Sequence, residues 1–262
     1  MLKRQFFTLI AILISLSSFG QDPIFKEYKS EQFSFEGHDA KVVFPNTPNK
    51  EKLWIWRARF WGHEPQLDKA LLDLGFHVVY VDVANLFGNN EAVEIWNSFY
   101  KHCRKEYGLN KKVVLEGMSR GGLIVYNWAA ENTKKVFSIY ADAPVCDIKS
   151  WPGGFYAGAG SPGDWEKCLE AYGLDSASVV DFKRIPIYNS IKVAKAGIPV
   201  IHVYGDADEV VPYEENTALL ADQFRKAGGT IKLIPKEGVG HHPHSLEDPA
   251  PLVEFILESI RK

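Results

Sequence analysis

One serine of this chain lies in a pattern of residues that could make its hydroxyl a nucleophile. Residues 117–121 read GMSRG, so that Ser119 has a glycine two positions away on either side. The apolar run VVLE directly precedes the first glycine, and a helical pattern follows the serine. These flanks predict a sharp strand-to-helix turn, in which side chains two positions from the serine would collide unless they are glycine. We expect the hydroxyl to project from the strand end, where the helix N-terminus stabilises a developing oxyanion.

A serine hydroxyl needs a base at neutral pH, and a histidine oriented by a carboxylate can supply it. Two later segments carry such residues, each directly after an apolar stretch typical of a buried strand: GDADEVVP at 205–212 and GVGHHPH at 238–244. In a parallel sheet the carboxyl ends of these strands meet at one edge. The sequence therefore predicts that a serine, a carboxylate and an imidazole come together at that edge.

The order of serine, acid and histidine resembles the α/β-hydrolase family, over nearly the whole chain after its N-terminal segment. The resemblance implies that Ser119 is the nucleophile and that His241, which follows a glycine in the loop after the last strand, is the base. It implies that the acid is Asp208, three residues after a glycine in a loop closed by a Val-Pro pair. Asp206 is then a turn-forming neighbour, and Asp142, at the end of the preceding strand, stays an alternative acid.

The same family binds the oxyanion with two backbone N–H groups. One is expected from Arg120, the residue after the nucleophile. The other is expected from the loop after the strand Leu53–Arg57, where the chain reads RARFWG and departs from the His-Gly of many relatives. Ala58 or Arg59 is the predicted second donor.

Three histidines close together, His241, His242 and His244, are a set that could bind zinc. Adjacent histidines point in different directions in most backbones, and Pro243 stiffens the loop. The sequence therefore predicts no metal site, and the expected chemistry needs no cofactor.

Two arginines are candidates to bind the substrate. Arg59 and Arg120 could each pair with a carboxylate, and the Ser-Arg pair is similar to the corresponding turn of glucuronoyl esterases, which act on uronic-acid esters. In the alternative, Arg120 points to solvent or pairs with an acid such as Glu116.

Aromatic residues are also expected near the nucleophile. Trp61, Trp151 and Trp165 fall in predicted loops at the carboxyl edge of the sheet, as do Phe155 and Tyr156. Their rings could support a sugar or fill the core beneath a lid. They favour a carbohydrate or aromatic ester as the substrate.

The elements that must position these residues alternate between strands and helices. Residues Gln32–Phe44 alternate apolar and polar and predict an antiparallel hairpin. The alternation predicts an α/β fold with a mostly parallel sheet and helices on both faces. Further strands are predicted at Leu53–Arg57, His77–Val83, Lys112–Leu115, Val136–Ala141, Pro199–Tyr204 and Thr230–Pro235, and helices at His63–Leu74, Glu91–Tyr107, Arg120–Asn132, Tyr213–Ala227 and Pro251–Ile260.

Residues 146–198 interrupt this rhythm with glycine, proline and aromatic residues, which predicts a loop-rich cap or lid insertion. Cys146 and Cys168 bracket part of it and are the only plausible disulfide pair, whereas Cys103 is expected as a buried helical residue.

The N-terminus has the pattern of a secretory signal peptide. Lys3 and Arg4 precede the apolar run Phe6–Leu16, and Ser18 and Gly20 provide small residues for cleavage after Gly20. The run is shorter than the ~20 residues that span a membrane. We therefore expect a secreted or periplasmic protein, free of the membrane after cleavage, with residues 21–262 as a single α/β-hydrolase domain.

The overall charge and composition exclude some classes of protein. Lys and Arg number 30 against 33 Asp and Glu, so no basic nucleic-acid-binding face is expected. The prediction is an exported serine hydrolase that cleaves carboxylic esters, with ester-decorated polysaccharide as substrate. One alternative is a peptidase of the prolyl-oligopeptidase type, although 262 residues leave no room for the propeller of those relatives. Another is a non-catalytic glycan-binding module, which would have no use for the ordered serine, acid and histidine.

Overall fold

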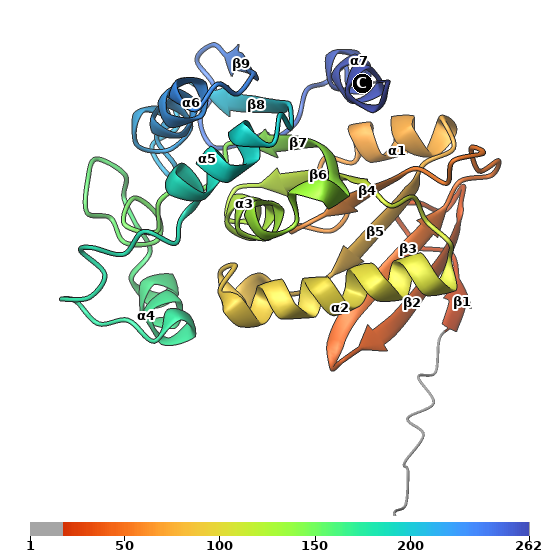
Figure 1. Ribbon diagram of the computed structural model, residues 1–262, viewed down its shortest axis with the longest axis horizontal. Coiled ribbons are helices and arrows are strands. Elements are labelled where there is room, and N and C mark those ends of the chain that lie inside the picture. The colour runs from red at the N-terminus through yellow and green to blue at the C-terminus, as the bar shows by residue number, and fades with distance from the viewer. Residues whose placement is uncertain (1–17, 262) are drawn as a thin grey trace, which may run out of the picture.

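The computed structural model describes residues 18–261, and in that part of the chain nine strands form one sheet (Figure 1). The strands lie in the order β1-β2-β3-β5-β4-β6-β7-β8-β9. The pairs from β1 to β5 are antiparallel, and those from β5 through β4 to β9 are parallel. The bounds are β1 Ser18–Gly20, β2 Lys29–Phe35, β3 His38–Phe44, β4 Trp54–Arg57, β5 His77–Val81, β6 Val113–Met118, β7 Val136–Asp142, β8 Val200–Gly205 and β9 Ile231–Lys236.

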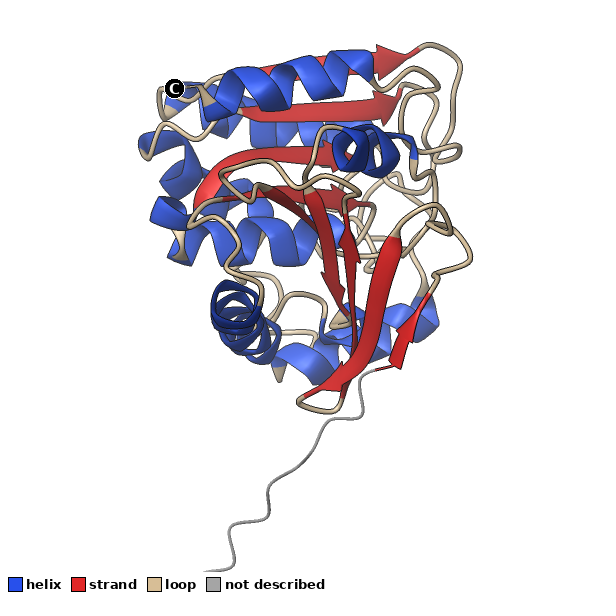
Figure 2. Ribbon diagram, turned by 90° about the vertical axis from the view of Figure 1, so that its right-hand side faces the viewer, coloured by secondary structure: helices blue, strands red, loops and turns tan. Residues whose placement is uncertain are grey.

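Helices cover both faces of the sheet (Figure 2). α1 and α7 bury their apolar sides on one face, and α2, α3, α5 and α6 bury theirs on the other. This arrangement confirms the predicted α/β-hydrolase fold class. The helices are α1 Gln66–Asp73, α2 Asn90–Glu106, α3 Gly121–Glu131, α4 Pro162–Tyr172, α5 Pro186–Lys195, α6 Thr217–Lys226 and α7 Ala250–Ile260, with 3-10 turns η1 Ala84–Leu86, η2 Thr133–Lys135 and η3 Tyr213–Glu215.

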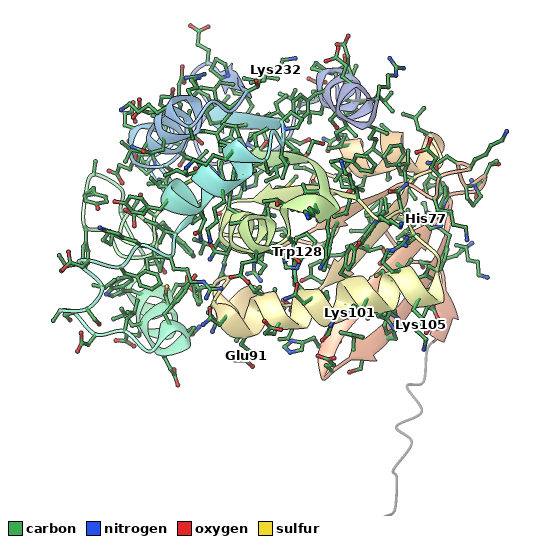
Figure 3. All side chains as sticks on the ribbon, viewed as in Figure 1. His77, Glu91, Lys101, Lys105, Trp128 and Lys232 are labelled. Atoms are coloured by element: carbon green, nitrogen blue, oxygen red, sulfur yellow. The ribbon has the colours of Figure 1, made fainter. Side chains whose placement is uncertain are left out.

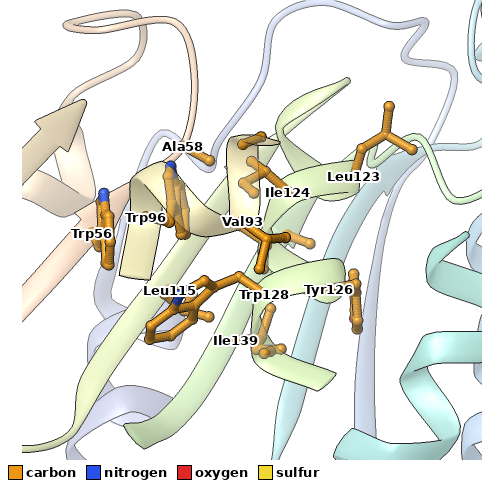
Figure 4. Close-up of a cluster of buried hydrophobic side chains, with 14 of the residues drawn as sticks. Trp56, Ala58, Val93, Trp96, Leu115, Leu123, Ile124, Tyr126, Trp128 and Ile139 are labelled. Atoms are coloured by element: carbon orange, nitrogen blue, oxygen red, sulfur yellow. The ribbon is translucent and has the colours of Figure 1, made fainter. Parts of the chain in front are cut away.

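Stacked tryptophans fix β4 against α2 and α3 (Figure 4). On β4, Trp54 and Trp56 point to the same face of the sheet because side chains alternate along a strand. Ile55 points to the opposite face, which α1 and α7 cover. The rings of Trp56 and Trp96 stack with centroids 4.0 Å apart, and Trp128 lies edge-on to Trp56 at 5.4 Å. All four tryptophans are fully buried. The cluster therefore holds the end of β4, and the loop that leaves it, in a fixed place beside α3.

The sequence of α2 shows why this helix forms and which way it faces. The Asn89 side chain accepts a hydrogen bond from the Ala92 N–H and caps the first turn. Glu91, Lys101 and Lys105 lie on the exposed side (Figure 3). The apolar side of the helix can therefore bury itself against the tryptophans.

The predicted loop-rich insertion at 146–198 contains two helices that the sequence analysis missed. Pro162 and Pro186 begin α4 and α5, where a proline needs no N–H donor. α5 packs between α3 and α6 and belongs to the helical layer of the domain. Only the part up to about residue 185 projects from the sheet as a cap (Figure 1).

Cys146 and Cys168, the only plausible disulfide pair, are both free and buried thiols, as is Cys103. Most of the predicted signal peptide, residues 1–17, lies outside the described residues. Residues Ser18–Gly20 pair with β2, so cleavage after Gly20 would remove β1. No helix among residues 18–261 is long and apolar enough to cross a bilayer.

Candidate active site

Ser119 occupies a strained turn between β6 and α3. Its φ is +49°, which is uncommon for a residue with a side chain. The turn is held by its backbone, since the Ser119 N–H donates to the Asp142 carbonyl at 2.9 Å. A Cβ at Gly117 would lie 2.9 Å from a methyl of Val125, and one at Gly121 would lie 3.2 Å from the Arg59 Cβ. A side chain at Gly117 would therefore force a shift, and one at Gly121 would be tightly packed against the loop after β4.

His241 lies between the serine and an aspartate, as the family resemblance implied. Its Nε2 is 3.0 Å from the Ser119 Oγ, and its Nδ1 is 2.7 Å from the Asp208 Oδ2. The other carboxylate oxygen, Oδ1, accepts the backbone N–H groups of Val210 and Val211 at 2.9 and 2.8 Å. The carboxylate thus cannot turn freely, and it fixes Nδ1 as the protonated nitrogen of the ring. We call Ser119, His241 and Asp208 the triad.

The loops that carry the acid and the histidine pack backbone against backbone. The Ala207 N–H donates to the Val239 carbonyl at 3.0 Å, and Asp206 accepts the Gly238 N–H at 2.7 Å. A Cβ at Gly205 would lie 2.1 Å from the Val239 carbonyl oxygen. Asp206 therefore has the turn-forming place that was expected of it.

Asp142, the alternative acid, is engaged elsewhere. Its Oδ1 lies 2.8 Å from the Nδ1 of His244, and its Oδ2 accepts the Ser245 N–H at 2.8 Å and the Tyr140 hydroxyl at 3.0 Å. Within the described residues it has no hydrogen bond with His241. The structure thus brings Asp208 to the histidine.

The two predicted donors for the second oxyanion contact differ in availability. The Ala58 N–H continues the parallel pairing of β4 with β6 and donates to the Glu116 carbonyl at 2.9 Å. Ala58 is therefore excluded as a donor. The hydrogen bonds within residues 18–261 include none from the backbone N–H of Arg59 or Arg120. The Arg59 nitrogen lies 3.7 Å from the position of a Cβ on Gly121, beside the start of α3.

A buried arginine that the sequence analysis did not single out holds this loop. Arg57 is 1 % exposed, and its Nη1 contacts Asp68 and lies 3.3 Å from the Glu116 carboxylate. Its Nε donates to the carbonyls of Arg59 and Phe60 at 3.3 and 3.1 Å. Burial raises the pKa of Glu116, and the Arg57 guanidinium opposes that shift. The guanidinium therefore fixes the backbone that carries the remaining donor.

Arg120 does not pair with Glu116. Its guanidinium lies over the rings of Phe87 and Trp151, 5.4 and 5.3 Å from their centroids, and 3.5 Å from Asp164 on α4. Burial lowers the pKa of Arg120, with the nearby Arg59 as the second cause. Arg59 and Arg120 line one small cavity next to the turn, together with Ala58, Val83, Phe87 and Gly121.

The predicted aromatic residues separate into two places. The Trp61 indole N–H donates to Asp22, and its ring packs on Phe25 and Tyr80 in the cluster near the N-terminal strands. Its assignment to the substrate site is therefore wrong. Trp151 is buried below Arg120, and Trp165 contacts Phe155 at 5.3 Å. The exposed aromatic surface comes from the other two predicted residues, Phe155 at 48 % and Tyr156 at 50 %.

One family model matches the chain, that of the prolyl oligopeptidase family, over residues 80–261. The matched range holds all three triad residues and more than half of the chain. In the comparison with curated proteins, none matches.

Several solved structures are similar in fold. Acylaminoacyl peptidase of Pyrococcus horikoshii has a TM-score of 0.61 at 14 % identity, covering 82 % of this chain and 38 % of that one. Est1E from Butyrivibrio proteoclasticus has 0.61 at 22 %, covering 89 % and 99 %. A truncated carbohydrate esterase from gut microbiota has 0.69 at 17 %, covering 87 % and 93 %. The chain thus spans less than half of the peptidase and nearly all of the other two, and the likeness shows the fold.

Proposed function

Because the chain belongs to the prolyl oligopeptidase family, we propose that it is a serine hydrolase whose triad cleaves carboxylic esters. The observation that carries the proposal is the pair of contacts made by His241, 3.0 Å to Ser119 and 2.7 Å to Asp208. The first distance allows proton transfer from the serine to Nε2, and the second is a hydrogen bond that orients the ring.

In the proposed reaction, the Ser119 Oγ attacks the ester carbonyl while its proton passes to His241 Nε2. Asp208 stabilises the imidazolium that forms. The backbone N–H groups of Arg120 and Arg59 stabilise the oxyanion. The alcohol leaves with the proton from Nε2, and water then attacks the acyl-enzyme with His241 again as the base. The bond to Ser119 breaks as its Oγ takes back a proton from Nε2, and the carboxylic acid is released. No cofactor takes part in these steps.

Support for an ester, and for a glycan that carries it, comes from two sides. The carbohydrate esterase is matched over 93 % of its length, whereas the acylaminoacyl peptidase is matched over 38 %. The exposed rings of Phe155 and Tyr156 offer apolar faces of the kind that pack on sugars. We therefore propose ester decorations of a polysaccharide as the substrate, and export by the predicted signal peptide as the route to it. N-terminal sequencing of the secreted protein should give Gln21 as the first residue.

Peptide cleavage is the second candidate, because the family is one of peptidases by its description. Initial rates on acetylated, methylated and feruloylated glycans should be compared with rates on short N-acylated peptides. Faster turnover of the peptides would reverse the order of the two proposals. A uronic-acid ester would be indicated if the methylated glycan is preferred and the preference is lost in Arg59→Ala.

The serine itself is tested by Ser119→Ala. This variant should lower kcat/KM on p-nitrophenyl acetate by about a millionfold and abolish labelling by a fluorophosphonate. Ser34→Ala, on the exposed side of β2, is the matched control and should behave as the wild type. Unchanged turnover in Ser119→Ala would refute the nucleophile, and glycan binding without any labelling of the wild type would favour a non-catalytic module.

A further inference from the structure

We propose that His63, His242 and His244 form a zinc-binding site beside the triad. One ligating ring nitrogen from each lies within 4.8 Å of the other two. His63 comes from the loop between β4 and α1, and the other two come from the loop after β9. The cluster therefore joins two loops that are far apart along the chain.

Two of these rings have a buried nitrogen without a partner. The Nε2 atoms of His63 and His244 are buried, and neither has a hydrogen-bond partner among the described residues. A buried polar atom that stays unpaired costs free energy, so a native structure normally satisfies it with water, a protein group or an ion. Both residues belong to the same cluster, which points to one ligand shared between them.

His244 has the arrangement typical of a zinc ligand. The residue is 2 % exposed, and its Nδ1 lies 2.8 Å from the buried Asp142 carboxylate. Such a carboxylate accepts the Nδ1–H, orients the ring and leaves the Nε2 lone pair for a metal. Lys236 shares this carboxylate at 4.0 Å, so the aspartate is held from two sides.

The distances between the three ring nitrogens suit a small tetrahedral ion once the rings move slightly closer together. Zinc binds histidine nitrogens at about 2.0–2.1 Å, which places two ligands of a tetrahedron about 3.4 Å apart. The longest separation here is 4.8 Å, so the rings must approach by about 1.4 Å at most. His242 is exposed and can rotate to do this, and its side leaves a fourth position for water. Imidazoles favour zinc over magnesium or calcium.

His241 is not a ligand in this proposal, because both of its ring nitrogens are engaged in the triad. The sequence analysis weighed a set of His241, His242 and His244 and predicted no metal. In the structure, His63 and not His241 completes the set of three. His63 lies 178 positions before His241 in the sequence. The site adjoins the triad, since the rings of His241 and His244 have centroids 4.8 Å apart.

Calorimetric titration of the chelator-treated protein with zinc chloride tests the site. We expect one zinc per chain, and a loss of affinity of at least about tenfold in both His63→Asn and His242→Asn. His38→Asn is the matched control, because this histidine lies in the β2–β3 hairpin and its side chain has one hydrogen bond within residues 18–261, with the Asp82 carbonyl. It should bind zinc as the wild type does. Ser119→Ala and His241→Asn should also keep the affinity, which separates this test from that of the hydrolase.

Thermal unfolding gives a second readout. At a zinc concentration one hundred times the Kd, the Tm of the wild type should rise by about 5 °C or more, and that of His63→Asn should not. Equal zinc affinity in the wild type, His63→Asn and His242→Asn would overturn the proposal. So would a loss of binding in His241→Asn with His63→Asn unaffected, because the ligand would then be the triad histidine.

Discussion

Asp208→Asn should inactivate the enzyme by reversing the proton position on His241. In the wild type, Oδ1 accepts two backbone N–H groups, at 2.9 and 2.8 Å, and Oδ2 faces the His241 Nδ1 at 2.7 Å. An asparagine must keep its oxygen on the two N–H groups, because its amide nitrogen cannot accept from them. The amide nitrogen then faces Nδ1 and donates to it. His241 therefore carries its proton on Nε2 and cannot take one from Ser119.

The magnitude follows from the loss of the correct tautomer and of the negative charge. The same replacement in a serine protease lowers kcat by about 10⁴, which corresponds to about 5 kcal/mol of transition-state stabilisation. We expect a fall of that order in kcat on p-nitrophenyl acetate, with KM changed little, since the substrate does not contact the aspartate. The Tm should stay close to that of the wild type, because both backbone hydrogen bonds remain.

Asp206→Asn is the matched control, two residues away in the same loop. Among the described residues its carboxylate accepts one hydrogen bond, from the Gly238 N–H, and an amide oxygen can do the same. Its activity should stay within tenfold of the wild type. The reasoning is refuted if Asp208→Asn retains more than a tenth of the activity, or if both variants lose equal amounts.

Three further outcomes concern stability. Arg57→Met leaves the buried carboxylates of Asp68 and Glu116 without their cation. Urea unfolding should show that the free energy of unfolding falls by about 3 kcal/mol or more. A fall below roughly 1 kcal/mol, the value of a surface ion pair, would contradict the prediction. Burial lowers the pKa of His202 to about 3, below its unfolded value of about 6.5. The stability that the neutral ring contributes is therefore fully present above pH 6.5 and is lost as the pH falls from there towards 3. Because of this residue, the free energy of unfolding should fall by about 2 kcal/mol between pH 7 and 5. His202→Gln should make the free energy of unfolding less dependent on pH over this range, and an unchanged slope would contradict the prediction. Trp96→Ala should cost about 3–5 kcal/mol of unfolding free energy, and a cost under half of that would show that the stack adjusts.

The parallel part of the fold was predictable because each of its strands is a short apolar run next to a helix with the right period. The hairpin before it was predictable from alternation around Gly37. α4 and α5 were missed because glycine and proline, which mark loops, here stand at helix starts. Which cysteines pair depends on how loops fold in space, so the spacing of Cys146 and Cys168 was uninformative.

Within the site, the three triad residues could be found because each comes after a predicted strand and lies in a local motif. The loop after β4 could not be predicted in the same way. A helix from His63 was expected, but Phe60, Gly62 and Glu64 adopt positive φ, and α1 begins only at Gln66. The cause is Arg57, whose side chain bonds carbonyls of this loop. A strand-end arginine carries no sign in the sequence that it will turn inward.

The backbone contact at Gly205 has a consequence for protein engineering. There is no room for a Cβ between the acid loop and the histidine loop, so the two loops pack as one block. An insertion in either loop would separate Asp208 from His241. The cap segment up to about residue 185 also contacts this block: the Ala159 N–H donates to the Glu209 carbonyl at 3.3 Å, and a Cβ at Gly158 would lie 3.0 Å from Pro212. Other cap sequences grafted between β7 and α5 must therefore keep the junction at Gly158 and Ala159 if Asp208 is to stay in place.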